Sequence, residues 1–173
     1  MDGLAKLLAR ASIEDALARY ARAVDRRDWE ALRGCYHPDA TDEHGEFSGT
    51  PDEFIAWVGA RHEKVAFSSH FLGNCLIEFL DDATAHVETY FTAMQRKPSG
   101  DGIGEVDSDV IGRYVDLFEN RQGEWKVAKR TVVYDGWRQV PSSHRPRTAA
   151  GTLGRRDRSD PVFTSPRPAN PSP

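Results

Sequence analysis

The stretch Ser12-Ile13-Glu14-Asp15-Ala16-Leu17-Ala18-Arg19-Tyr20-Ala21-Arg22-Ala23-Val24-Asp25 decides how the N-terminal part of this chain folds. Its apolar residues recur at spacings of three and four, which predicts an amphipathic helix with one buried face. Asp25 continues that face, four residues after Ala21. A carboxylate turned toward a core costs several kcal/mol unless it has a partner. We therefore expect Asp25 to bind a polar side chain from elsewhere in the chain.

The partner we predict is His70, in the strand-like segment Ser68-Ser69-His70-Phe71-Leu72. Asp25 would hold one ring nitrogen while the other takes a proton from a substrate, which makes the pair a general base. Tyr20 is the third candidate catalytic residue, as a hydroxyl acid or anchor. The alternatives are a hydrogen-bonded core histidine and a packed core tyrosine.

The order of elements predicts an α+β fold. Residues 4–25 form the first helix, with a bend and a capping box near Ser12. A short helix follows at 28–36, then a strand at 40–47, and Thr50-Pro51 begins a third helix. The remaining predicted elements are strands rich in β-branched and aromatic residues, at 65–71, 75–80, 84–95, 106–120 and 124–138. Helices followed by neighbouring strands are typical of an α+β domain with a curved antiparallel sheet.

Length and composition predict one domain, residues 1–140, and a Pro/Arg-rich tail, residues 141–173. The net charge is −4; the tail contains six Arg and two Asp, so it carries +4 and the domain carries −8. An acidic domain argues against nucleic acid as a partner. No apolar run approaches the roughly 20 residues of a membrane span, and the N-terminus lacks a signal peptide pattern. We expect a cytoplasmic protein, without membrane association, with Cys35 and Cys75 reduced.

Several motifs together resemble the SnoaL-like branch of the nuclear transport factor 2-like superfamily, over about residues 8–140. The residues that carry the resemblance are Ile13-Glu14-Asp15, Tyr20, Asp25, Trp29-Glu30, Tyr36-His37-Pro38-Asp39-Ala40, His70, Asn74, Arg113-Tyr114-Val115-Asp116 and Gly123-Glu124-Trp125-Lys126. The resemblance implies a cone-shaped α+β barrel, with the sheet wrapped around the helices and an apolar pocket inside.

Within the superfamily, the chain is similar to gamma-hexachlorocyclohexane dehydrochlorinase, bile acid 7-alpha-dehydratase and scytalone dehydratase around Tyr20, Asp25 and His70. These enzymes imply proton abstraction and loss of a leaving group from a cyclic substrate, without a cofactor. Two features differ: Tyr20 stands where the dehydrochlorinase has a catalytic Lys, and the stretch 90–94 lacks an acid that the bile acid enzyme uses.

The predicted function is therefore a cofactor-independent lyase, dehydratase or isomerase that acts on a small apolar cyclic or aromatic substrate. Carbon–carbon cleavage of lignin-like diarylpropanes belongs to the same proton-transfer chemistry. The alternative is a non-catalytic binding or assembly module, such as the small subunit of a ring-hydroxylating dioxygenase. The fold hosts both classes.

Four further residues are candidates for substrate binding. Arg113 shares a strand face with Ile111 and Val115, so it either enters the pocket or pairs with an acid such as Glu88 or Asp116. Tyr134 would close the pocket mouth or pack in its strand. Phe54 and Trp57 lie on the apolar face of the third predicted helix.

For the other polar residues we expect no catalytic role. The cluster His37, Asp39, Asp42, Glu43 and His44 matches no standard metal-site spacing, so we expect no metal there. We expect His62 and His86 to be exposed or interfacial.

Both faces of the long predicted sheet carry apolar residues, but helices can cover only one. We therefore predict a homodimer or homotrimer formed through the outer face. In the tail, residues 154–163 are either disordered or dock on a neighbouring subunit through Phe163.

Overall fold

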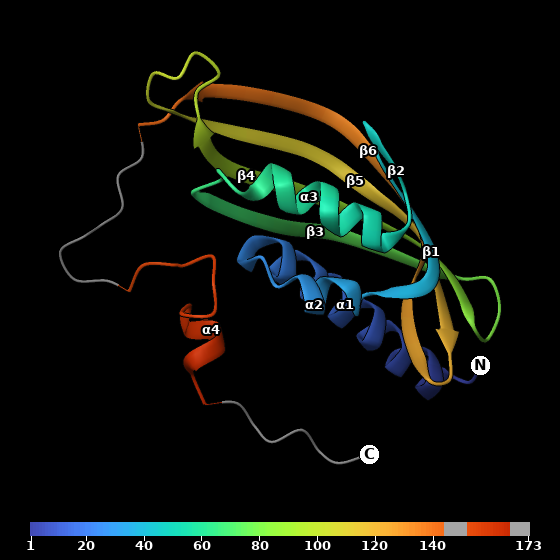
Figure 1. Ribbon diagram of the computed structural model, residues 1–173. Helices are drawn as coiled ribbons and strands as arrows, with labels where there is room; N and C mark the ends of the chain where they lie inside the picture. The colour runs from blue at the N-terminus through green and yellow to red at the C-terminus, as the bar shows by residue number, and fades with distance from the viewer. Residues whose placement is uncertain (144–151, 167–173) are drawn as a thin grey trace.

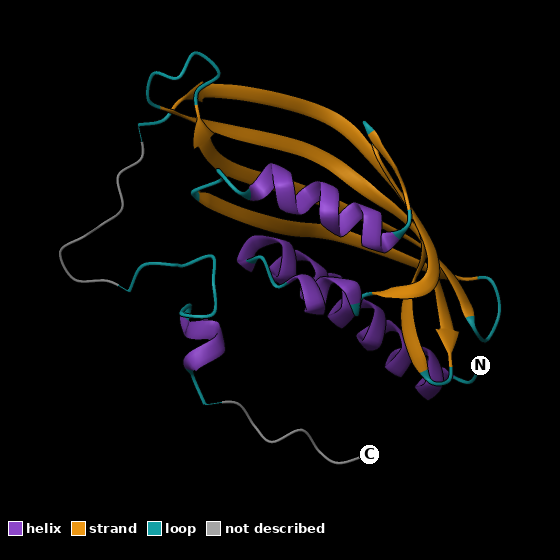
Figure 2. Ribbon diagram, viewed as in Figure 1, coloured by secondary structure: helices purple, strands orange, loops and turns teal. Residues whose placement is uncertain are grey.

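The computed structural model describes residues 1–143 and 152–166. Its elements, in chain order, are α1 (Gly3–Arg26), α2 (Trp29–Arg33), β1 (Tyr36–His44), β2 (Phe47–Gly49), α3 (Pro51–His62), β3 (Phe67–Phe79), β4 (Thr84–Pro98), β5 (Glu105–Arg121), β6 (Glu124–Pro141) and α4 (Pro161–Thr164). The predicted α+β class is confirmed: helices α1, α2 and α3 lie on one side of a single curved sheet (Figures 1 and 2). No helix in these described ranges combines the length and apolar character needed to cross a membrane.

Helix α1 is slightly longer than the predicted residues 4–25, and it lacks the interruption predicted near Ser12. It begins at the N-cap Asp2, whose side chain accepts from the backbone N–H of Ala5, and continues without interruption to Arg26. Ser12 does not cap a helix, because its hydroxyl donates to the carbonyl of Leu8 within the helix. The predicted buried face is confirmed by Ile13, Leu17, Tyr20 and Val24, all nearly inaccessible to solvent. Each large apolar side chain buried there contributes about 1.5–3 kcal/mol.

Helix α3 begins where the sequence predicted. Thr50 and Glu53 form a reciprocal capping box, and Pro51 occupies the first turn. This arrangement satisfies backbone donors that would otherwise lack partners at the helix start. The helix then runs across the concave face of the sheet (Figure 1).

The sheet has the strand order β2-β1-β6-β5-β4-β3. Strands β3 to β6 form the antiparallel meander that the turn residues predicted. The two predicted strands at 65–71 and 75–80 are one strand, β3, with an irregularity between Leu72 and Cys75. A bulge of this kind bends a strand without ending it.

Strand β1 corrects the expectation of a purely antiparallel sheet, since it pairs in parallel with β6. It begins at Tyr36, earlier than the predicted residue 40, because α2 ends at Arg33. The chain reaches β1 through helices and not through a hairpin, so nothing forces an antiparallel pairing. The cone therefore has a mixed sheet that does not close, with β2 and β3 at its two margins.

Gly112 allows the central strands to pack closely at the bend of the sheet. A Cβ atom there would lie 2.3 Å from the carbonyl oxygen of Val133 and 3.0 Å from the ring of Phe91. The pairing of β5 with β6 shifts register at this point, between Ile111 and Gly112. The shift leaves Tyr134 on the concave side, where the helices lie.

The described part of the tail, residues 152–166, contacts the body of its own chain. Arg156 donates to the carbonyls of Asp25 (2.9 Å) and Val65 (2.6 Å). Arg158 pairs with Asp28 at 2.9 Å. The segment is thus held by charge-assisted hydrogen bonds to its own domain, whereas we predicted disorder or a neighbouring subunit.

Candidate active site

A cavity of about 640 Å³ lies between α3, the C-terminal half of α1 and the concave face of the sheet. Aromatic side chains dominate its wall: Tyr20, Phe54, Trp57, Phe91, Tyr114, Tyr134 and Trp137. Trp137, on β6, is 64% exposed, so the cavity opens to solvent at that end. A largely aromatic cavity of this size suits a small ring compound.

Asp25 and His70 meet at the wall of this cavity. His70 Nδ1 lies 2.7 Å from Asp25 Oδ1, within the range expected of a hydrogen bond. Asp25 also accepts from the Ser68 hydroxyl (2.7 Å) and the backbone N–H of His70 (2.8 Å). The last residue but one of α1 and the first half of β3 are brought together because α1 packs against β3. The contact predicted between the two side chains is therefore present.

These hydrogen bonds keep Asp25 ionised although it is buried. Burial raises the pKa of the Asp25 carboxyl, but the hydrogen bond and charge of His70, with the backbone and Ser68 donors, lower it below its usual value. An ionised Asp25 accepts a hydrogen bond from His70 Nδ1 and so holds the ring in one orientation. His70 Nε2, which has no partner among the described residues, is then free to accept a proton in the cavity.

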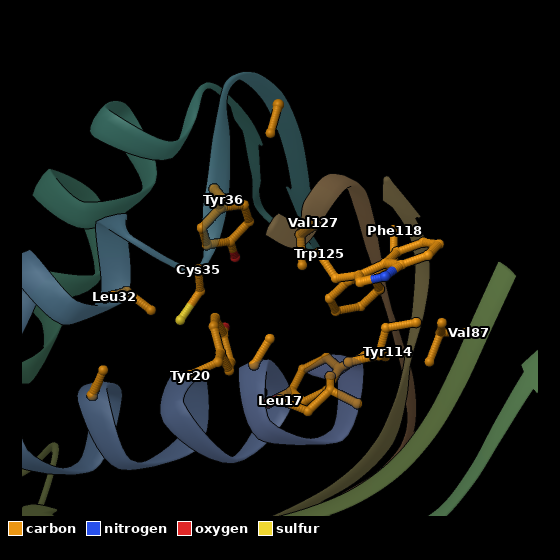
Figure 3. Packing of buried hydrophobic residues seen from close by; sticks show 14 of the residues in the cluster. Leu17, Tyr20, Leu32, Cys35, Tyr36, Val87, Tyr114, Phe118, Trp125 and Val127 are labelled. Atoms are coloured by element: carbon orange, nitrogen blue, oxygen red, sulfur yellow. The ribbon is translucent and has the colours of Figure 1, made fainter. Parts of the chain in front are cut away.

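Tyr20 reaches the cavity, but its environment differs from the one predicted. Its ring packs on the guanidinium of Arg130, 4.1 Å from the ring centroid, and edge-to-face on Tyr36 and Tyr114. These tyrosines converge from α1, β1 and β5 in the interior (Figure 3). Burial raises the pKa of Tyr20 above its ordinary value, even though Arg130 opposes the shift. The phenol therefore stays neutral and is a weaker acid than in water.

The sequence analysis missed Arg130, which is wholly buried on β6. Its Nε and Nη2 form a bidentate pair with Asp116 at 2.8 and 2.6 Å. Burial lowers the pKa of Arg130, but Asp116 raises it well above the usual value, so Arg130 stays charged. Strand alternation could have indicated that Arg130 points inward, because it lies on the same strand face as Val132 and Tyr134.

His62 was also assigned wrongly, since it is only 5% exposed and lines the cavity. Arg156 donates to its Nδ1 at 2.8 Å, and its Nε2 faces the amide of Gln95 at 3.1 Å. Burial and the charge of Arg156 lower the pKa of His62 to about 3. Arg156 arrives from the tail, 94 residues away, and no local pattern signals it.

This depressed pKa predicts a pH dependence of stability. The unfolded histidine has a pKa near 6.5, so the unfolded state binds a proton first as the pH falls. The stabilisation by neutral His62 is complete above pH 6.5 and is lost as the pH falls toward 3. We expect His62→Gln to flatten the decline in the free energy of unfolding across this window, measured by urea denaturation. Identical slopes in the two proteins would contradict the burial of a neutral His62.

The candidate substrate-binding residues separate into two groups. Phe54, Trp57 and Tyr134 line the cavity. Arg113 does not: it pairs with Glu88 at 2.7 Å and with Asp135 at 2.9 Å. The alternation placed Arg113 beside Ile111 and Val115 correctly, but that is the convex face, which α1 and α3 leave uncovered. Arg113 therefore does not reach the cavity, and the predicted role in substrate binding is wrong for this site.

The five residues considered as a metal cluster do not converge. His37 contacts the carbonyl of Glu119, and Asp39 pairs with Arg121. Glu43 accepts from Thr131. Only Asp42 and His44 meet, with His44 Nδ1 3.1 Å from Asp42 Oδ1.

Comparisons with known proteins agree with this architecture. The family model of the SnoaL-like domain matches residues 5–131. No curated protein matches the chain at the sequence level. A type 2 hexachlorocyclohexane dehydrochlorinase, LinA, superposes with TM-score 0.75 and 18% identity, over 86% of this chain and 100% of its own.

Two solved structures from Novosphingobium aromaticivorans DSM 12444 are also similar. One is a candidate scytalone dehydratase, with TM-score 0.70 and 19% identity, over 86% of this chain and 98% of its own. The other is the beta subunit of a candidate aromatic-ring-hydroxylating dioxygenase, with TM-score 0.59 and 20% identity, over 76% of this chain and 92% of its own. At these identities the likeness establishes the fold alone.

Proposed function

Because this chain belongs to the SnoaL-like domain family, we propose that it is a cofactor-independent lyase that abstracts a proton from a small, largely apolar ring compound. The observation that carries the proposal is the His70–Asp25 hydrogen bond of 2.7 Å at the wall of an aromatic cavity. A base with a fixed tautomer, open to a cavity, meets the geometric requirement for general-base catalysis.

In this mechanism, His70 Nε2 takes a proton from a carbon of the ring. Asp25 holds the imidazole through Nδ1 and stabilises the imidazolium that forms, without itself taking the proton. Phe54, Trp57 and Tyr134 bind the ring by apolar contact. The buried, neutral Tyr20 contributes a hydrogen-bond donor or a packing surface beside the reacting ring.

Hydrogen–deuterium exchange of cyclohexanone tests proton abstraction alone, because this ketone carries no leaving group. In D₂O, the protein is expected to accelerate loss of the α-proton signal in ¹H NMR above the rate in buffer. A rate equal to that of buffer at millimolar ketone would count against His70 as a base in this cavity.

A second candidate function is an assembly module, like the dioxygenase beta subunit that shares the fold. The observation that favours it is the convex face of the sheet, which exposes large apolar residues to solvent: Phe71, Leu76, Tyr90, Met94 and Ile111. A module would form a stable complex with a larger partner and would leave the exchange rate of cyclohexanone unchanged.

The same exposed face supports self-association of the proposed enzyme. Phe71 on β3 is 74% exposed, and apolar patches of several hundred Å² usually mark interfaces. Light scattering is expected to give a dimer or trimer at micromolar concentration, and Phe71→Asp is expected to shift it toward monomer. The matched control is Ile103→Asp, in the exposed loop between β4 and β5. A monomeric wild-type protein would refute the interface.

A further inference from the structure

The cavity wall holds a second imidazole with its own carboxylate. His44, at the end of β1, lines the cavity, and its Nδ1 lies 3.1 Å from Asp42 Oδ1. Asp42 is completely buried and also accepts from the Tyr36 hydroxyl at 2.5 Å. The pair therefore repeats the arrangement of Asp25 and His70: a buried carboxylate, a hydroxyl donor to it, and an imidazole facing the cavity.

The surroundings of His44 hold its ring in place. The ring stacks on Phe54 with centroids 4.8 Å apart, and Trp57 and Tyr134 lie 5.8 and 6.3 Å away. With Nδ1 bound to Asp42, the nitrogen left over is Nε2, which has no partner among residues 1–143 and 152–166. An imidazole fixed in this way is positioned for proton transfer and not only for packing.

The two imidazoles reach the same cavity from different strands. His44 comes from β1 and His70 from β3, which are separated in the sheet by β6, β5 and β4. Helix α3 spans the interval, with Phe54 against His44 near its start and His62 at its end.

We propose that His44 is a second catalytic residue, a general acid that protonates a departing hydroxyl group, so that the reaction is the loss of water from a hydroxylated ring. This inference rests on the proposed function of His70 as the base. The C–H bond breaks and its proton goes to His70 Nε2, and the electron pair forms the ring double bond. The C–O bond breaks as the oxygen takes the proton of His44 Nε2, and water leaves. Solvent then returns His70 to its neutral form and His44 to its protonated form.

Different polar groups surround the two pairs. Arg156 lies beside the first pair, 2.9 Å from the carbonyl oxygen of Asp25, and three donors share the charge of the Asp25 carboxylate. Asp42 receives two donors, and Arg61 and Glu46, which also line the cavity, pair with each other at 3.4 Å. The two pairs therefore differ in the donors that their carboxylates receive, three for Asp25 and two for Asp42.

A pair of ring ketones that differ only in the leaving group tests the role of His44. 3-Hydroxycyclohexanone loses water to give cyclohexenone, and its hydroxyl needs a proton to leave. 3-Acetoxycyclohexanone gives the same product, but acetate leaves as an anion. We expect His44→Gln to lower the rate of water loss about 10²-fold more than the rate of acetate loss, followed by enone absorbance. His70→Ala should slow both, and His86→Gln, on the exposed convex face, is the matched control.

The outcomes separate this inference from the function on which it rests. If wild-type protein eliminates neither compound, both fail; if it eliminates acetate but not water, only the role of His44 fails. Equal losses on both ketones in His44→Gln would make His44 a structural residue and overturn the inference.

Because His44→Gln can also disturb packing on Phe54, Asp42→Asn provides a second variant. Asp42→Asn is expected to lower the rate of water loss more than the rate of acetate loss, as His44→Gln does, because the imidazole is no longer held by a carboxylate. An Asp42→Asn protein that loses water at the wild-type rate would show that Asp42 does not position His44.

Discussion

Replacement of His70 by Ala is expected to lower the rate of cyclohexanone exchange by about 10²–10⁴-fold, the usual contribution of a positioned general base. The physical reason is that the variant keeps the cavity but has no group to accept the proton. Asp25→Asn is expected to give a smaller loss, because an imidazole remains but its tautomer is no longer fixed by a carboxylate. Exchange is measured by ¹H NMR, and binding of cyclohexanone is measured separately by titration.

Two controls make this result interpretable. His86→Ala removes an exposed imidazole on β4 and is expected to exchange at the wild-type rate. Melting temperatures identify variants that lose activity by unfolding, which matters for Asp25 because three donors depend on it. Near-full exchange in a folded His70→Ala protein would make His70 a core residue, and the search for a base would move to His44 and Tyr20.

The largest effect on stability is expected from Arg130→Met. This change leaves Asp116 wholly buried without the cation that pairs with it, and breaking a buried pair in this way typically costs about 3–5 kcal/mol. The contacts of the guanidinium with Tyr20 and Tyr114, at 4.1 and 4.2 Å from their ring centroids, are lost as well. The free energy of unfolding is measured by urea denaturation.

The double variant Arg130→Met/Asp116→Leu shows where that cost arises. Removal of both charges avoids an unpaired buried carboxylate, so the double variant is expected to recover most of the loss. The matched control is Arg33→Met, which breaks a more exposed pair with Asp52 and is expected to cost less than about 1 kcal/mol. A loss below 1 kcal/mol for Arg130→Met alone would show that water or another group satisfies Asp116.

Much of the fold was predictable because its signals are local. The spacing of Ile13, Leu17 and Val24 identified the buried face of α1, and Thr50-Pro51 identified the start of α3. The meander from β3 to β6 followed from alternation and from turn residues between neighbouring strands. Asp25 stood out by the same reasoning, because a charge on an apolar helix face requires a partner.

Only the tertiary structure decided which distant segments meet. Alternation states which face of a strand is buried, but not which strand lies beside it. The parallel pairing of β1 with β6 brought His44 to the cavity, and the bidentate contact with Asp116 made Arg130 a buried cation. His62 became a buried, neutral imidazole because Arg156 contacts it from the far end of the chain. Local sequence thus determined the elements and the need of Asp25 for a partner, while the long-range contacts, which have no periodicity to reveal them, arose from the packing of the whole chain.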